Sequence, residues 1–313
     1  MPWTAEDLPE LAGRTILVTG ATSGLGEAST VALAVRGARV VLATRSAERT
    51  AALMDRIRTR RPHASVEHLP LDLADLASVE RAAAALAERV DRLDVVLANA
   101  GVMATPLRRT EDGFELQIGV NHLGHFALVG RLLPLLVAAP EPRVVVVSST
   151  AHRLARLDVN DLLWERARYQ RWVAYGNSKL ANLLHVLELQ RRAEAAGSPL
   201  TAVGAHPGFA ATNLQLAGPA MQGGIRGLVT GTSRRVANAL VAQPAAQGAL
   251  PQLYAATAPA LPGGSYWGPD GPGEARGYPA PATRSGRARD AGLAAALWQR
   301  SEELTGVTYD LGS

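Results

Sequence analysis

The first 150 residues of this 313-residue chain alternate short apolar runs with longer stretches rich in alanine and arginine. The apolar runs are nearly continuous, which is typical of parallel strands buried on both faces of a sheet. Right-handed crossovers through the intervening helices predict an α/β fold, a doubly wound parallel sheet of the Rossmann type with helices on both faces. The predicted strands are 15–19, 39–44, 66–71, 94–99 and 143–149, and the predicted helices lie near 25–36, 47–60, 75–90 and 112–138.

The same pattern continues beyond residue 150, and no linker separates two halves. We expect a long helix at about 174–195, a strand at 200–206 and helical material up to about 257. Residues 258–289 are rich in proline, glycine and arginine, which predicts an irregular surface segment. The amphipathic stretch 291–304 is expected to fold back onto the body. One domain is therefore expected over 1–313, with its core at about 13–257 and a C-terminal extension at 258–313.

Composition excludes several classes of function. The formal net charge is +4 and the basic residues are scattered, whereas a nucleic-acid interface needs a concentrated basic face. Without cysteine, disulfides and thiolate chemistry are excluded. The N-terminus lacks an apolar signal core, and the most lipophilic stretch, 126–139, is interrupted and too short to span a bilayer. We therefore expect a cytoplasmic protein without a membrane anchor. Four histidines flank motifs without carboxylates at metal spacing, so we expect no metal site and interpret them as packing or capping residues: His122, His125, His152 and His206.

A glycine-rich turn, TGATSGLG at 19–26, follows the first predicted strand directly. Glycines at 20, 24 and 26 would let the backbone approach a pyrophosphate, while the N-terminus of the next helix offers N–H groups and a partial positive charge. The spacing is G-x-x-x-G-x-G and differs from the commoner G-x-G-x-x-G. A tight turn without a ligand is the alternative, but the position after the first strand of an α/β sheet favours a nucleotide site.

The end of the second predicted strand indicates which dinucleotide would bind. An acidic residue there would bind the ribose 2′-hydroxyl of NAD, but the strand ends in Ala43, Thr44, Arg45 and Ser46. Arg45 could neutralise a 2′-phosphate, so we expect NADP(H) to be preferred over NAD(H), with a plain surface arginine as the alternative. Asp72 could accept a hydrogen bond from the adenine amino group or could serve a nearby helix N-terminus.

The sole lysine of the chain, Lys179, lies four residues after Tyr175. In a helix this spacing puts both side chains on one face. A fixed ammonium would lower the pKa of the tyrosine hydroxyl from its usual value near 10. Lysine can also bind two ribose hydroxyls with a geometry that a planar guanidinium fits poorly. An exposed Tyr–Lys pair without function is the alternative.

Several motifs occur together in the order typical of one known superfamily: TGATSGLG, ANAG (98–101), the asparagine of GVNHLGHF (119–126), VSS (147–149), YGNSK (175–179) and HPG (206–208). Over residues 19–208 the chain thus resembles the short-chain dehydrogenase/reductase superfamily. The long segment between VSS and the tyrosine resembles the retinol-dehydrogenase-like and WW-domain-oxidoreductase-like branch. The endings YWGPDGPGEARGYPAP and LWQRSEELTGV resemble bacterial members of that branch.

The resemblance implies a catalytic role for four residues. Tyr175 would give the proton to a carbonyl oxygen or take it in the oxidising direction, with Lys179 beside it. Ser149, the second serine of its pair, would hydrogen-bond that oxygen as charge builds on it, unless it only satisfies the backbone at the end of a strand. Asn121 would hold a water that relays protons to Lys179, and a helix-interior amide that kinks the helix is the alternative.

The resemblance also implies a set of cofactor contacts. Asn99, Ala100 and Gly101 would close over the adenosine ribose. Pro207 and Gly208 would pass beside the nicotinamide, with Thr212 near its carboxamide. Together with the glycine turn, Arg45 and Asp72 considered above, the full predicted set of cofactor contacts is Gly20, Thr22, Ser23, Gly24, Leu25, Gly26, Arg45, Asp72, Leu73, Asn99, Ala100, Gly101, Tyr175, Lys179, Pro207, Gly208 and Thr212.

These features predict an NADP(H)-dependent oxidoreductase that interconverts a carbonyl and a primary or secondary alcohol. Residues 209–242 are apolar with many small side chains, which favours a hydrophobic small-molecule substrate and a lid with glycine hinges. The segment 153–172 must fold outward for Ser149 and Tyr175 to meet. A non-catalytic regulator that senses NADP(H) is one alternative, and isomerase or dehydratase chemistry on nucleotide sugars is another. Homo-oligomers are common in the superfamily.

Overall fold

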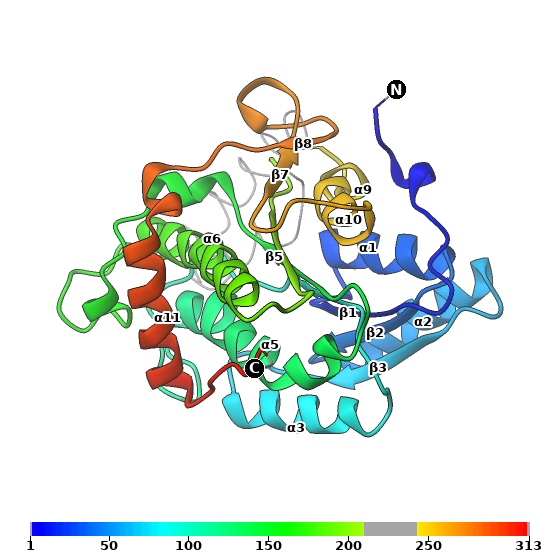
Figure 1. Ribbon diagram of the computed structural model, residues 1–313, viewed down its shortest axis with the longest axis horizontal. Coiled ribbons are helices and arrows are strands. Elements are labelled where there is room, and N and C mark those ends of the chain that lie inside the picture. Colours follow the sequence, from blue (N-terminus) through cyan, green and yellow to red (C-terminus); the bar gives the residue numbers. More distant parts are fainter. Residues whose placement is uncertain (1, 210–242, 312–313) are drawn as a thin grey trace, which may run out of the picture.

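The computed structural model describes residues 2–209 and 243–311, and a single sheet runs through its centre (Figure 1). Within these residues the strand order is β3-β2-β1-β4-β5-β6-β7-β8. Neighbours from β3 to β7 are parallel, and β8 is antiparallel to β7. The expected doubly wound sheet is therefore confirmed. The strands are β1 (Thr15–Thr19), β2 (Arg39–Thr44), β3 (Val66–Pro70), β4 (Val95–Ala98), β5 (Arg143–Val147), β6 (Thr201–Ala205), β7 (Tyr266–Pro269) and β8 (Pro279–Pro281).

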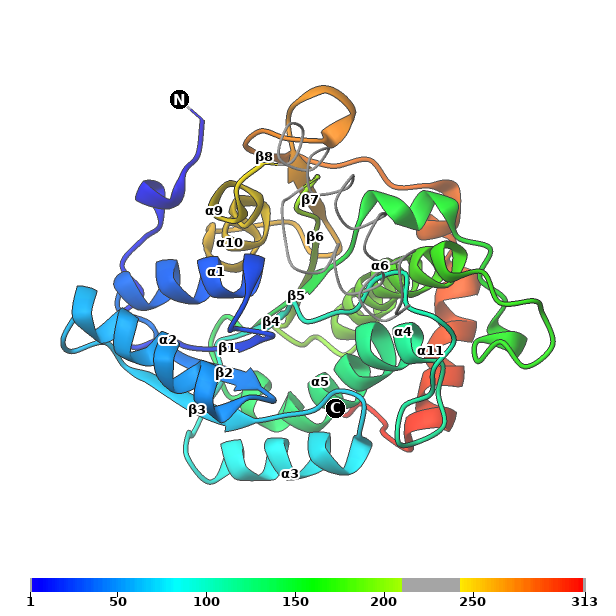
Figure 2. The ribbon, with the colours of Figure 1, turned by 180° about the vertical axis from the view of Figure 1, so that it is seen from behind.

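Helices cover both faces of the sheet, as the two opposite views in Figures 1 and 2 show. Alternate residues of one strand serve different cores: Leu17 belongs to the core with α3, α5 and α6, and Ile16 and Val18 to the core with α1, α2 and α10. Burial on both sides explains why the strands are apolar throughout. Apart from the short α4 described below, the α-helices of the described residues are α1 (Gly24–Val35), α2 (Ala47–Arg60), α3 (Leu76–Ala87), α5 (Gly124–Val137), α6 (Arg171–Ala195), α9 (Ala245–Gly248), α10 (Leu250–Thr257) and α11 (Ala291–Thr305).

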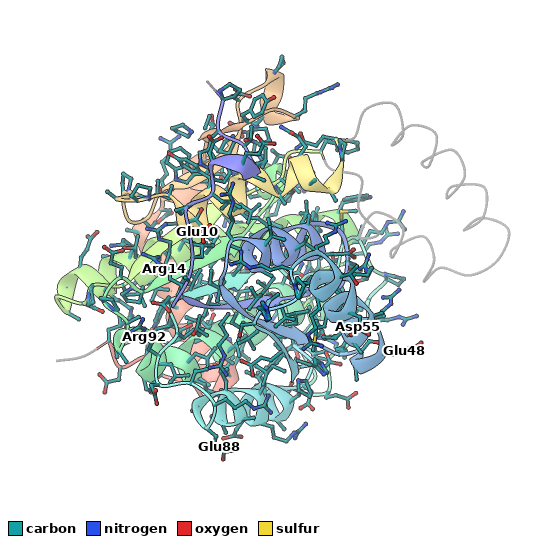
Figure 3. All side chains as sticks on the ribbon, turned by 90° about the vertical axis from the view of Figure 1, so that its right-hand side faces the viewer. Glu10, Arg14, Glu48, Asp55, Glu88 and Arg92 are labelled. Carbon is teal, nitrogen blue, oxygen red and sulfur yellow. The ribbon has the colours of Figure 1, made fainter. Side chains whose placement is uncertain are left out.

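Local sequence signals fix several helix ends. Ser46 accepts a hydrogen bond from the backbone of Arg49 at the start of α2, and Asp75 does the same for Ala77 at the start of α3. Charged side chains on the outer faces of these helices, such as Glu48 and Asp55 of α2, point away from the sheet (Figure 3). The amphipathic pattern thus determines which side of each helix is buried.

The C-terminal helix folds back onto the body, as the sequence predicted. The ring of Trp298 in α11 lies 5.0 Å from that of Phe126 in α5 and 4.5 Å from that of Tyr309, measured between centroids. The Tyr309 hydroxyl donates to the carbonyl oxygen of Phe126 at 2.6 Å. Gly130 is required below this contact, since a Cβ there would lie 2.6 Å from Val307 and from the Tyr309 ring. α11 and the residues after it therefore complete the core over α5 and α6.

The prediction of an irregular surface segment at 258–289 is wrong in part. β7 continues the sheet beside β6, with Tyr266 opposite Gly204, and β8 adds an antiparallel edge. Tyr266 is buried, and Gly204 leaves it room because a Cβ there would lie 2.9 Å from its ring. Two short strands containing Pro and Gly carry no periodic signal, so only the packing against β6 reveals them.

The predicted helix at 112–138 is interrupted. It consists of α4 (Leu116–Ile118), a π-helical turn at Gly119–Leu123 and then α5. The run Leu116–Val137 is longer than the stretch 126–139 considered from the sequence, and it is long and apolar enough to cross a membrane by length and composition. Of an 18-residue window within this run, 72% is buried inside the fold. It serves here as a core helix. The π-helical turn matters for the site, because such turns often mark functional positions.

The insert at 153–172 is anchored at several points. Leu157 and Leu162 are buried in a core that they share with Leu180 of α6. The carboxylate of Asp161 accepts hydrogen bonds from three successive backbone N–H groups, those of residues 165, 166 and 167. The insert therefore packs beside α6, and α6 begins at Arg171, three residues earlier than the sequence predicted.

Candidate active site

The glycine turn lies at the carboxyl end of β1, where the strand order reverses between β1 and β4. Gly20 and Gly24 have φ of 66° and 54°, in the left-handed region that favours glycine. A Cβ on Gly26 would collide with the carbonyl oxygen of Gly20 and lie 2.6 Å from the Asn99 amide nitrogen. Ser23 precedes α1 but makes no side-chain cap. Its neighbours Thr22 and Leu25 complete a turn whose shape and open helix N-terminus fit a pyrophosphate.

A second turn after β4 is tied to the glycine turn. The hydroxyl of Thr19 accepts hydrogen bonds from the backbone N–H groups of Asn99 and Ala100 at 3.0 and 2.9 Å. The side chain of Asn99 donates to the carbonyl oxygen of Thr19 at 2.9 Å. Gln252 of α10 in turn donates to the Asn99 side chain at 3.2 Å. Sequence reasoning did not single out Thr19 or Gln252; Thr19 opens the motif TGATSGLG, which was the available signal.

The structure brings Ser149, Tyr175 and Lys179 together at the same edge of the sheet. Ser149 follows β5, and its hydroxyl accepts the backbone N–H of Ala151 at 3.2 Å. Its side chain also lies near enough to Tyr175 on α6 to lower the pKa of that phenol. Lys179 lies one turn along α6, with its ammonium 5.8 Å from the centre of the Tyr175 ring, and donates to the carbonyl oxygen of Val147 at 3.0 Å. The insert therefore does not keep the two hydroxyls apart.

The expected lowering of the tyrosine pKa is not found. Burial raises the pKa of Tyr175 to about 12, and the nearby Ser149 side chain offsets this only in part. Burial lowers the pKa of Lys179 to about 8. Desolvation acts on both groups and outweighs the attraction that the spacing in the sequence suggested, so at neutral pH a protonated phenol lies beside an ammonium.

The neighbouring residues Ser148 and Tyr169 have other roles. The Ser148 hydroxyl is buried and donates to the backbone carbonyl oxygen of Lys179 at 2.7 Å, so it fixes α6 against β5. The Tyr169 hydroxyl lies 3.0 Å from the carboxylate of Glu115 and 3.1 Å from the carbonyl oxygen of Thr105. Geometry thus distinguishes Ser149 and Tyr175 from the similar residues nearby.

Asn121 lies in the π-helical turn with its side chain fully engaged. Its amide oxygen accepts from the backbone N–H of Val102 at 2.7 Å, and its amide nitrogen donates to the Val102 carbonyl oxygen and to Ser178, each at 2.9 Å. The π-helical turn agrees with the alternative given for Asn121, that of an amide inside a helix that distorts the helix. Its backbone carbonyl oxygen is hydrogen-bonded to Nδ1 of His125 at 3.2 Å and keeps a second lone pair that could accept from a water. A Cβ on Gly101 would lie 3.0 Å from the Asn121 amide oxygen and 3.5 Å from the Lys179 ammonium.

Arg45 and Asp72 face each other beyond the ends of β2 and β3. Their charged groups are 3.8 Å apart, and the Arg45 side chain is 73% exposed. Asp72 also accepts from the backbone N–H of Ala74 at 3.0 Å, within the loop that precedes α3. Leu73 is buried against Gly124, where a Cβ would meet its backbone. Asp75, not Asp72, caps α3.

The turn after β6 carries Pro207 and Gly208. Gly208 has a φ of 64°, and the next residue, Phe209, donates its N–H to the carbonyl oxygen of Ala275 at 2.7 Å. The Gln243 side chain donates to the Pro207 carbonyl oxygen at 2.7 Å. Thr212 and the expected lid at 210–242 lie outside the described residues.

The four motif histidines pack or cap within the fold, as expected. Nitrogens of His122 and His125 lie 2.9 and 2.8 Å from the hydroxyls of Ser301 and Thr19. His152 and His206 contact the Ser149 carbonyl oxygen and the Gly208 N–H. Within the described residues, no three His, Asp or Glu side chains gather in a way that could hold a metal ion.

Comparison with known proteins identifies the family of this chain. The family model described as short chain dehydrogenase matches residues 14–222. Human retinol dehydrogenase 13 is 43% identical over 204 residues, which are 64% of this chain and 60% of that protein. Mouse polyprenol dehydrogenase is 38% identical over 306 residues, which are 96% of this chain and 86% of that protein. The chain thus spans about 60% of the length of the first relative and most of the second.

Solved structures agree. An uncharacterized protein from Mycobacterium paratuberculosis is 45% identical with a TM-score of 0.80, covering 99% of this chain and 100% of that one. A protein described as a short chain dehydrogenase from Escherichia coli, complexed with NADPH, is 28% identical with a TM-score of 0.53, covering 64% of this chain and 79% of that one. The chain therefore belongs to the short chain dehydrogenase family, with retinol-dehydrogenase-like proteins among its relatives.

Proposed function

We propose that the protein is an NADP(H)-dependent oxidoreductase that interconverts a carbonyl and an alcohol on a hydrophobic substrate. One observation carries the proposal: Tyr175 lies near Ser149 and beside the sole lysine, at the edge of the sheet where the glycine turn opens. A proton donor, an oxyanion partner and a dinucleotide cradle are the parts that such a reaction needs. The names of the curated relatives support the same class of reaction.

The residues for holding the cofactor come from three strand ends. The glycine turn and the N-terminus of α1 would hold the pyrophosphate, and Asn99–Gly101 would hold the adenosine ribose. Arg45 would pair with a 2′-phosphate, because no carboxylate occupies the end of β2 and the guanidinium is well exposed. The NADPH complex of the Escherichia coli protein supports this preference. The nicotinamide of NADPH, when bound, supplies the hydride that reduces a carbonyl carbon.

The protein's own residues would manage the proton. With a pKa of about 12, Tyr175 holds its proton at neutral pH and can give it to an oxygen on which negative charge develops. Ser149 would donate a hydrogen bond to the same oxygen. Lys179, still largely an ammonium at neutral pH, would favour the phenolate that remains after the transfer. Asn121 would contribute through its backbone carbonyl, since its amide is already bonded.

A hydrophobic substrate agrees with the side chains exposed around this edge. Leu154 after β5, Trp172 at the start of α6 and Phe209 after β6 are large apolar residues left exposed, although most such residues in the described chain are buried. The ring of Trp172 lies 6.4 Å from that of Tyr175, at 82°. Trp172 therefore offers an apolar surface one helical turn before the proton donor.

The experiment that tests the function is a steady-state assay of NADPH consumption with aldehydes and ketones of increasing apolar size. We expect turnover that rises with the apolar area of the substrate, and alcohol oxidation with NADP+ in the reverse direction. If no carbonyl or alcohol supported any change in the nicotinamide absorbance, although NADPH bound, the proposal would be wrong.

A further inference from the structure

We propose that Glu274 is a positioning residue that holds two segments of the proposed site in register. These segments are the turn after β6, which carries Pro207 and Gly208, and the start of the 3-10 helix η3 (Thr150–Leu154), which follows Ser149. The inference rests on the proposed function, because their relative placement matters only if a hydride acceptor lies between them. Glu274 lies in the loop between β7 and β8, within the region that the sequence predicted as irregular surface.

The backbone of Glu274 has an unusual conformation. Its φ is +57°, in the left-handed region that residues with a Cβ seldom adopt. Such a conformation persists when the surroundings determine it, and it is often found next to functional sites. The Glu274 side chain is only 18% exposed, so it is held within the loop. The strain is therefore offset by the contacts that this side chain makes.

The first of these contacts leads to the turn after β6. Nδ1 of His206 accepts a hydrogen bond from the Gly208 N–H at 3.2 Å, so a neutral ring carries its proton on Nε2. Burial lowers the pKa of His206 to about 4, which makes the neutral ring the dominant form. Nε2 lies 3.1 Å from the Glu274 carboxylate, although the angle is poor for a hydrogen bond. The N–H of Nε2 is therefore attracted to the carboxylate chiefly by charge.

The neighbouring residue strengthens the same connection. The carbonyl oxygen of Ala275 accepts the N–H of Phe209 at 2.7 Å, and a Cβ on Gly208 would collide with that oxygen. Glu274 and Ala275 thus hold the turn at two points, the ring of His206 and the backbone beyond Gly208. The glycine is required here because the loop approaches so closely.

The second contact leads to the segment that follows Ser149. The guanidinium of Arg153 in η3 lies 3.3 Å from the same Glu274 oxygen that faces His206. The other Glu274 oxygen accepts the N–H of Thr283 at 2.8 Å. His152, beside Arg153, donates from Nδ1 to the Ser149 carbonyl oxygen at 2.7 Å and accepts the Ser285 N–H on Nε2 at 3.2 Å. The segment from 274 to 285 therefore holds both sides of the site from outside.

The carboxylate of Glu274 thus connects two parts of the site. Through Arg153 it contacts η3, which follows Ser149, and through His206 it contacts the turn that carries Pro207 and Gly208. Ser149 would meet the substrate oxygen and this turn would lie beside the nicotinamide. A small error in the distance between reacting groups can lower a rate by up to about a hundredfold. Loss of Glu274 should therefore slow the chemical step and leave binding of the distant adenosine half of the cofactor unchanged.

The experiment compares Glu274→Gln, Glu274→Ala and Glu274→Gly with the control Glu303→Ala. The Glu303 side chain lies on α11, is 50% exposed and pairs with Arg300 at 2.9 Å. Gln keeps the shape of the side chain and one acceptor oxygen. Ala removes the carboxylate, and Gly removes it and also relieves the strain of the left-handed backbone conformation. For each protein, kcat, the NADPH dissociation constant and amide hydrogen exchange of 149–154 and 206–209 are measured. Hydrogen exchange needs neither cofactor nor turnover.

We expect kcat to fall about tenfold in the Ala and Gly variants and less in Gln, with NADPH affinity changed less than about twofold. Hydrogen exchange of the Gly208 and Phe209 amides should accelerate about tenfold in the Ala and Gly variants and less in the Gln variant. Glu303→Ala should match the parent protein. Unchanged exchange in Glu274→Ala would overturn the proposal, as would faster exchange with unchanged kcat. Recovery of kcat in the Gly variant would also overturn it, since backbone strain alone would then explain the effect.

Failure of the proposed function gives a different pattern. If the parent protein neither binds NADPH nor turns over any carbonyl, the proposed reaction is wrong and the positioning role with it, even where hydrogen exchange still reports that the contact exists. If the parent protein is active and Glu274→Ala is equally active, only the positioning role is wrong.

Discussion

The ammonium of Lys179 lies 5.8 Å from the centre of the Tyr175 ring and donates to the carbonyl oxygen of Val147 at 3.0 Å. Both side chains are buried. Among the described residues no carboxylate forms an ion pair with this ammonium. Its burial therefore costs stability and lowers the pKa of Lys179 to about 8. This charge lies beside the hydroxyl that we propose as proton donor. We therefore expect Lys179 to lower the stability of the fold and to be needed for activity.

Lys179→Met should abolish turnover and stabilise the fold. Below about pH 8 both the folded and the unfolded chain hold the lysine proton. The full free-energy cost of burying the ammonium is then present, and it lowers the stability of the fold by roughly 3 kcal/mol. Between about pH 8 and the ordinary value of 10.5 the unfolded chain binds more protons, so the stability of the parent protein rises with pH. Asn182 also donates to the Val147 carbonyl oxygen at 3.0 Å, so that oxygen keeps a partner in the variant.

The measurement is denaturant unfolding of both proteins at neutral pH and at about pH 9.5, where the stability difference should shrink by about half. A Met variant that is less stable than the parent protein at neutral pH, or a difference independent of pH, would contradict the assignment of a buried charge.

Arg45→Ala should weaken NADPH binding about tenfold and leave NADH binding unchanged, because an exposed guanidinium contributes one charge-assisted contact to a 2′-phosphate. Arg81→Ala is the matched control: its side chain is 70% exposed and lies 3.2 Å from Asp75. Fluorescence titration with each cofactor gives the dissociation constants. Equal losses of affinity for NADPH and NADH would show that Arg45 does not bind the 2′-phosphate.

Gly26→Ala should prevent dinucleotide binding and cost about 2 kcal/mol of stability, since the added Cβ meets the backbone of Gly20 and the side chain of Asn99. Gly286→Ala is the control, because a Cβ there has no atom within 4 Å. Thermal unfolding with and without NADPH measures both effects. A Gly26 variant that is still stabilised by NADPH would show that the cradle lies elsewhere.

Trp172→Ala should raise KM for large apolar carbonyls about tenfold and leave kcat with a small aldehyde unchanged, because the indole offers apolar surface beside Tyr175 without taking part in proton transfer. The check is a comparison of the two KM values across a substrate series. A uniform loss for every substrate would instead indicate that the start of α6 had moved.

Much of the fold follows from the sequence, because apolar runs buried on both faces and helices with one apolar face are local patterns. β1 and β2 end where they were predicted to end. β7 and β8 could not be predicted, since the fit of Tyr266 against Gly204 depends on residues far apart in the chain. The same holds for Glu274, which only the folded loop brings to His206 and Arg153.

The site was predictable as a set of residues but not in its electrostatics. Motif order placed Ser149 and Tyr175 in one site, and the structure brings them close enough for Ser149 to influence the pKa of Tyr175. The expected lowering of the tyrosine pKa is wrong, because burial raises this pKa. A spacing of four residues predicts that the two groups are close but does not predict how deeply they are buried. For Asn121, its amide proved to be bonded to Val102 and Ser178, a pairing that no local pattern encodes.

The most direct test of the proposed function is the rate of hydride transfer in Tyr175→Phe, followed by the loss of NADPH absorbance after mixing with a carbonyl substrate. Tyr254→Phe is the control, since that ring lies on α10 and packs against Trp3 and Trp267. We predict that Tyr175→Phe binds NADPH as the parent protein does and loses about a thousandfold in rate, while Tyr254→Phe keeps both properties. A Tyr175→Phe variant that reduces the substrate at the parent rate would contradict the proposed mechanism.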